Sequence, residues 1–164
     1  MNTEQEFDRI FRQEFRGLMD QMIFQNDNGE YEAFGRYIIR PGSDGYHVSC
    51  AATDVGVFTN TRNALSWCIA DKNKSYALAR DLHRLDQKLG HITNDIAVRA
   101  AIGDRSTRPQ FREDIEIKLE GKIILKKQLE LQLAKCVNQA KYYQQRGLDN
   151  ETARTGRKPN KTSR

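Results

Sequence analysis

The chain has 164 residues, of which 38% are hydrophobic and 30% are charged. This balance fits one elongated, helix-rich domain with a thin core, because much of the chain must face water. The formal net charge of +5 at pH 7 permits attraction to phosphate without requiring it.

Targeting segments and disulfides are not expected. The first residues carry acids and lack the apolar stretch of a secretory signal, and no run of about 18 apolar residues predicts a membrane-spanning helix. The three cysteines, Cys50, Cys68 and Cys136, are widely spaced and form no CxxC pair. We therefore expect reduced, buried thiols in a cytoplasmic protein that has no membrane partner.

Residues 1–30 are predicted to form an amphipathic helix, over 3–25, followed by a turn. Thr3 and Glu6 have the spacing of a capping box. The stretch Asn26-Asp27-Asn28-Gly29 would end the helix, because Asn and Gly tolerate the left-handed backbone. We expect the apolar face to pack on the protein's own core, with a partner-binding helix as the alternative. That face consists of Phe7, Ile10, Phe11, Phe15, Leu18, Met19, Met22 and Ile23.

The spacing of apolar residues changes from a helical to an alternating pattern after residue 35. Strands are predicted at 35–40, 46–51 and 55–59, with turns at 41–45 and at Thr53-Asp54. Short loops between consecutive strands imply a three-stranded antiparallel meander, which with the next helix makes a βββα unit over 31–74. One face should carry Tyr37, Ile39, Tyr46, Val48, Cys50 and Phe58, and the other Arg36, Ile38, Arg40, His47, Ser49, Val55 and Val57.

Residues 61–147 are predicted to form a long antiparallel helical hairpin that is broken once, at 103–109. Beyond Lys74 the apolar face of the first helix narrows to a seam with alternating steps of four and three residues. This spacing is typical of a coiled coil. The fold class expected for the whole chain is therefore α+β. The seam consists of Leu78, Leu82, Leu85, Leu89, Ile92 and Ile96.

The second helix, from Pro109 to about Arg146, has a wider apolar stripe. Ile117, Ile124 and Leu131 fall outside any single narrow seam. A stripe this wide usually touches more than one neighbour. The first helix can take one part of it, and either the N-terminal helix or a second copy of the chain can take the remainder.

Residues 148–164 contain little to bury and are predicted to be a disordered basic tail. The tail either keeps the protein in solution or contacts phosphate without sequence preference.

The sequence lacks the common catalytic and cofactor motifs. No Gly-rich phosphate loop, GxSxG or HExxH motif occurs. His83 and Asp86 share a helical face, as do His91 and Asp95, but the second helix has no histidine to complete a metal site. We expect these pairs to be solvated, and we expect no catalytic residue, metal or other cofactor.

The junction Val55-Gly56-Val57-Phe58-Thr59-Asn60-Thr61-Arg62-Asn63-Ala64 resembles the G-x-F-x-(S/T)-x-x-x-A junction of two related folds. These are the plant ethylene-response-factor DNA-binding domain and the arm-binding domain of tyrosine recombinases. In both, the Phe and Ala hold a three-stranded sheet on a helix, and the outer face of the sheet enters the DNA major groove. Over residues 35–74 the resemblance implies these roles for Phe58 and Ala64, although the apolar residues on the outer face depart from a groove-reading surface.

Three other stretches, at 64–74, 98–102 and 150–156, look like parts of proteins from large tailed phages of marine cyanobacteria. This resemblance implies a phage origin and the host cytoplasm as location. It brings no activity with it.

Together these observations favour a non-enzymatic protein that acts by binding, through self-association of the hairpin and a basic surface near DNA or RNA. The alternative is a virion component, or an adaptor that modulates a host protein and has no affinity for nucleic acid. The candidate phosphate contacts are Arg36, Arg40, His47, Lys72, Lys74, Arg80, Arg84, Arg154, Arg157, Lys158 and Lys161.

Overall fold

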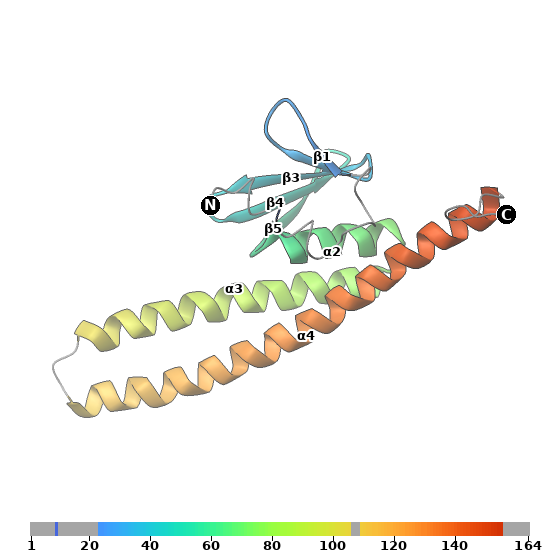
Figure 1. Ribbon diagram of the computed structural model, residues 1–164. Helices are drawn as coiled ribbons and strands as arrows, with labels where there is room; N and C mark the ends of the chain where they lie inside the picture. Colours follow the sequence, from blue (N-terminus) through green and yellow to red (C-terminus); the bar gives the residue numbers. More distant parts are fainter. Residues whose placement is uncertain (1–8, 10–22, 106–108, 156–164) are drawn as a thin grey trace.

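The computed structural model describes residue 9, residues 23–105 and residues 109–155 of the chain. An antiparallel sheet packs on a short helix, and two long helices lie side by side beneath them (Figure 1). The α+β class is therefore confirmed. The strands are β1 (Ile23–Gln25), β2 (Tyr31–Ala33), β3 (Tyr37–Gly42), β4 (Gly45–Cys50) and β5 (Thr53–Phe58), and the helices are α2 (Thr61–Lys72), α3 (Tyr76–Arg105) and α4 (Pro109–Thr155).

The sheet is a meander in which every strand pairs with the next one in an antiparallel register. The described residues form five strands in place of the three predicted. The two additional strands are β1 and β2, and β1 includes residues 23–25, which were predicted to end a helix. The remainder of the predicted N-terminal helix, apart from the helical Arg9, lies outside the described residues.

Residues 26–29 form the loop of the β1–β2 hairpin, and the prediction that they end a helix was wrong. The Asn26 side-chain oxygen accepts hydrogen bonds from the backbone N–H groups of Asn28, at 2.9 Å, and Glu30, at 3.0 Å. Gly29 has a φ of +78°, a value that glycine adopts without strain. Asn and Gly therefore act here as hairpin residues, since the left-handed backbone serves strand turns as well as helix ends.

The β4–β5 turn is also displaced from its prediction. Ala51 and Ala52 have φ values of +50° and +69°, so they form the turn, and Thr53 already belongs to β5. A register shift then falls between Val48 and Ser49. The shift lets Val55 pack against the core, although the alternating pattern had assigned Val55 to the outer face.

The core lies between the sheet and the helices. Phe58 and Ala64, which correspond to the sheet-to-helix contact of the resemblance, are both fully buried. Of the residues predicted to face inward, Cys50 alone is half-buried. Of the three cysteines predicted to be buried, Cys68 is buried, whereas Cys50 and Cys136 are half-buried; all three are free. The residues of the predicted inner face that are buried are Tyr37, Ile39, Tyr46, Val48 and Phe58.

The first long helix of the prediction is in fact two helices, α2 and α3, which are separated at residues 73–75. Lys74 has a φ of +61°, and its N–H donates to the Asp71 carbonyl at 3.0 Å. The N–H of Ser75 donates to the Ala70 carbonyl at 2.8 Å. This pair of bonds is a Schellman motif, which normally has glycine at the left-handed position. The sequence gives no warning of the break because Lys occupies that position.

A buried carboxylate joins α3 to the start of α2. Asp86 is fully buried, and its two oxygens accept from the Thr59 N–H at 3.1 Å each. The Thr59 hydroxyl at 2.7 Å and the Asn63 amide at 2.8 Å also donate to Asp86. The predicted solvated face at His83 and Asp86 is therefore wrong for Asp86. The helix period places a residue on a face but does not say what covers that face.

Helices α3 and α4 pack together as the predicted hairpin (Figure 1). Leu78, Leu82, Leu85 and Leu89 of the predicted seam are buried, and Ile92 and Ile96 nearer the tip are half-buried. The α4 helix continues to Thr155, so the prediction that the tail starts at residue 148 was wrong. None of the described helices is long and apolar enough to cross a lipid bilayer.

Replacing Lys74 with glycine should stabilise the protein. Lys74→Gly removes the penalty of a left-handed L-residue and should raise the free energy of unfolding by about 1 kcal/mol. Lys74→Ala keeps the Cβ and serves as the control, with an expected change close to zero. Urea denaturation of the two variants measures the difference, and a lower stability for the glycine variant than for the alanine variant would contradict the assignment.

Removing the Asp86 carboxylate should be strongly destabilising. Asp86→Ala removes the acceptor of the part-buried donors of Thr59 and of the buried Asn63 amide, which should cost about 2–4 kcal/mol of unfolding free energy. The control is Asp81→Ala on the exposed side of the same helix, which should change stability by less than about 0.5 kcal/mol. Equal effects at the two positions in urea denaturation would show that the buried bonds contribute nothing.

Candidate nucleic-acid and protein interfaces

Two of the predicted phosphate contacts meet on the outer face of the sheet. Arg40 and His47 are direct cross-strand partners on β3 and β4. They line a hollow of about 370 Å³. Its other lining residues include Glu30, Ile38, Ser49 and Asp54.

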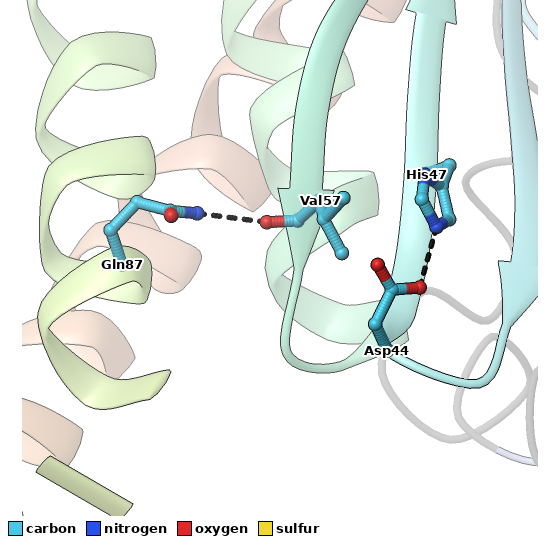
Figure 2. Close-up of polar contacts among 4 residues, drawn as sticks. All are labelled: Asp44, His47, Val57 and Gln87. Atoms are coloured by element: carbon cyan, nitrogen blue, oxygen red, sulfur yellow. Dashed lines mark hydrogen bonds and ion pairs between the residues drawn. The ribbon is translucent and has the colours of Figure 1, made fainter. Parts of the chain in front are cut away.

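The surroundings of this pair are acidic. His47 Nε2 lies 2.7 Å from Asp44 Oδ1. Figure 2 shows the two side chains turned towards each other. This hydrogen bond lowers the pKa of the Asp44 carboxyl below its usual value. Glu30 and Asp54 line the same hollow as Arg40. A phosphate approaching here would meet three carboxylates beside one arginine, so the outer face is a poor groove-reading surface.

Arg36 directly precedes the first residue of β3, whereas Arg40 lies within the strand. Its Nη2 is 3.4 Å from Cys50 Sγ, and its guanidinium lies 5.2 Å from the centre of the Tyr37 ring. The hydrogen bond with Cys50 is the main cause that raises the pKa of the Arg36 guanidinium. Arg36 is exposed, but its side chain is engaged with the sheet.

The predicted contacts on the helices fall into a second group. Lys72 ends α2, donates to Gln144 Oε1 of α4 at 3.3 Å, and lies 4.8 Å from the centre of the Phe34 ring. Lys72 therefore links the sheet, α2 and α4. Exposed side chains are found at Lys74, Arg80 and Arg84, and Arg84 pairs with Asp81 at 3.6 Å.

The remaining predicted contacts belong to the C-terminal segment. Arg154 is part of α4, and Arg157, Lys158 and Lys161 lie outside the described residues. The helices cover the inner side of the sheet, whereas Arg40 and His47 are on its outer side (Figure 1). The structure thus brings Arg40 and His47 together and separates them from Lys74, Arg80 and Arg84.

The hairpin carries a groove that the sequence analysis missed. A hollow of about 700 Å³ lies between α3 and α4, with Ile92, Leu125 and Leu129 as its apolar lining. Lys122 Nζ of α4 forms an ion pair with Asp95 Oδ2 of α3 at 2.7 Å, and both residues line this hollow. The polar lining residues are Lys88, His91, Asp95, Lys122, Gln128 and Gln132.

Asp95 is held between two cations from different helices. Besides Lys122 on α4, Arg99 Nε approaches Asp95 Oδ1 at 3.2 Å within α3. The hydrogen bond from Lys122 lowers the pKa of the Asp95 carboxyl; partial burial opposes this, and the charge of Arg99 adds to it. The sequence predicted a solvated His91–Asp95 face, and both residues reach solvent: His91 is exposed and the Asp95 side chain is 36% exposed. What the sequence did not show is that Asp95 also ties the two helices together.

Large apolar side chains remain exposed along this hairpin. Contiguous exposed apolar patches are uncommon on monomeric proteins, so these side chains are candidates for an interaction surface. One signal for it was present in the sequence, because three of these residues fall outside the main seam of α4. The exposed large apolar residues on α3 and α4 are Tyr76, Val98, Ile102, Phe111, Ile117, Ile123, Ile124, Leu125, Leu131 and Tyr142.

Two buried titratable groups inside the core serve packing. The Tyr37 hydroxyl donates to Asp71 Oδ2 at 2.5 Å, and burial followed by this bond raises the pKa of Tyr37. Burial likewise raises the pKa of the Cys68 thiol. Both groups keep their protons at neutral pH, so neither is an activated nucleophile.

No group of three or more His, Cys, Asp or Glu side chains within the described ranges is placed to hold a metal ion. No family model, curated protein or solved structure matches this chain significantly. The geometry of the described residues is therefore the basis for a proposal about function.

The Lys122–Asp95 pair should be visible in a pH titration. Lys122→Met should raise the pKa of the Asp95 carboxyl towards its ordinary value, because the largest lowering contribution is lost. A carboxyl with a lowered pKa stabilises the fold above its ordinary pKa, and this contribution disappears as the pH falls through the folded-state value. NMR titration of the carboxyl carbon measures the shift, with Lys127→Met as a control that should leave Asp95 unchanged.

Proposed function

We propose that this protein acts by binding another protein, through the α3–α4 hairpin, whose tip extends beyond the sheet (Figure 1). The observation that carries the proposal is the apolar groove between α3 and α4, with exposed Ile102 and Phe111 nearer the tip. A groove of this kind fits the apolar side of an amphipathic helix. Its lining also holds exposed Lys88 beside the Lys122–Asp95 ion pair, and these charges would orient such a helix.

The proposal corresponds to the adaptor alternative of the sequence analysis. Two features favour it over nucleic-acid binding. The outer face of the sheet places acids around Arg40, and the other basic side chains are divided between layers of the fold. If the resemblance to phage proteins holds, the partner is a host protein or another component of the virion.

Substitution in the lining of the groove tests this function. Leu125→Glu places a charge in the apolar lining and should reduce the recovery of a specific partner at least about tenfold, since a buried unpaired carboxylate is costly. Affinity capture from cyanobacterial extract, with nuclease added, compares the variant with the wild-type chain. The control is Glu32→Lys on the far side of the sheet, which should leave recovery unchanged. A partner that is recovered equally by all three chains does not use the groove.

Nucleic-acid association is the second candidate, and one observation favours it. Arg80 and Arg84 are exposed one helical turn apart on α3, close in sequence to exposed Lys74. If these side chains contact phosphate, affinity for DNA or RNA should fall steeply with salt, and Arg80→Gln with Arg84→Gln should reduce the slope of log K against log salt by about 2. Absence of binding at low salt would remove this candidate.

A further inference from the structure

A second apolar strip runs along α4. Ile117, Ile124 and Leu131 are seven residues apart, and their side chains are 62%, 58% and 66% exposed. Each helical residue turns the direction of the side chain by about 100°, so the strip lies about 180° from buried Ile115 and Leu133. The α4 helix is therefore apolar on two opposite faces, and its contact with α3 uses one of them.

The position of α4 in the fold leaves this strip accessible. Helices α2 and α3 both pack on the other side of α4, and the sheet lies beyond them (Figure 1). Nothing in the part of the chain that the structure describes covers Ile117, Ile124 or Leu131. Burying such side chains is worth about 1.5–3 kcal/mol each, so a partner for the strip would be strongly favoured.

Charges beside the strip change sign along the helix. Exposed Glu113 and Glu120 lie towards the start of α4, and exposed Lys127 and Lys135 lie further along. By the helical period, all four project within about one sixth of a turn of the apolar strip. The centre of this charge pattern falls at residue 124, which is also the middle of the three apolar positions.

We propose that two copies of this chain associate through the strip, with their α4 helices antiparallel and a two-fold axis near Ile124. In this arrangement Ile117 faces Leu131 of the second copy, Glu120 lies near Lys127, and Glu113 lies near Lys135. In a parallel arrangement each of these charged residues would face the identical residue of the second copy, and the like charges would destabilise the dimer. The pattern of charges therefore selects both a second copy as the occupant and the direction of its helix.

The dimer uses a different side of α4 from the groove. Leu125 is turned by about 100° from Ile124, so it belongs to the groove and not to the strip. The pairing of one helix with another gives an interface at the small end of the range for stable complexes, so the dissociation constant should be micromolar. The dimer and the proposed groove function can therefore each fail while the other holds.

Sedimentation velocity of the full chain, from about 1 to about 200 μM, tests the association over the concentrations at which a micromolar dimer dissociates. The wild-type chain should shift from monomer to dimer within this range. Ile124→Glu places two carboxylates at the axis and should raise the dissociation constant at least about tenfold. Leu125→Glu is the matched control and should leave the dimer unchanged. A wild-type chain that stays monomeric, or equal effects of the two substitutions, overturns the proposal.

Charge reversal tests the direction of the helices at low salt. Glu120→Lys alone, and Lys127→Glu alone, should each weaken the dimer about tenfold by placing like charges together. The double variant Glu120→Lys/Lys127→Glu should return to the wild-type dissociation constant. A parallel dimer would give no weakening in either single variant, and that result overturns the antiparallel arrangement. Circular dichroism confirms that these exposed positions leave the helices intact.

Discussion

The contact of Asp86 with the β5–α2 junction determines how α3 is oriented relative to the sheet and α2. The fully buried carboxylate accepts from the Thr59 N–H, the Thr59 hydroxyl and the Asn63 amide. Thr59 directly follows β5, and Asn63 is in the first turn of α2. One side chain of α3 therefore fixes the end of the sheet and the start of its covering helix at once. A buried carboxylate with several donors is costly to displace, which gives the long helices a defined direction relative to the sheet.

The direction of α3 has consequences for α4. The Schellman motif at Lys74 turns the chain between α2 and α3, so α2 stays on the sheet while α3 continues past it. Helix α4 then packs on both α2 and α3 near the sheet, and on α3 alone towards the tip. The burial of the seam declines in the same direction, from Leu82 to Ile96. The hairpin consequently keeps exposed apolar side chains towards its tip, at Val98, Ile102 and Phe111.

Much of the fold could be predicted from the sequence, because the alternating and heptad spacings of apolar residues indicate which face of a strand or helix is buried. The buried positions of the sheet and the seam from Leu78 to Leu89 were predicted from these patterns and confirmed. The β1–β2 hairpin and the α2–α3 break were missed, since Asn26–Gly29 suits two kinds of turn and Lys74 replaces the usual glycine. The groove at Leu125 was missed for a different reason. It is formed by two helices whose mutual rotation no single segment encodes.

Helix α3 also covers part of the free edge of the sheet at β5, where an extended segment of another chain could pair with the strand. A terminal strand offers unused backbone groups to any extended segment, which invites strand addition and aggregation. Gln87 of α3 reaches across and donates to the Val57 carbonyl at 2.8 Å (Figure 2). An amide from a helix thus occupies a hydrogen-bonding position that a sixth strand would need. Strand addition at this point of β5 would therefore have to displace the Gln87 side chain first.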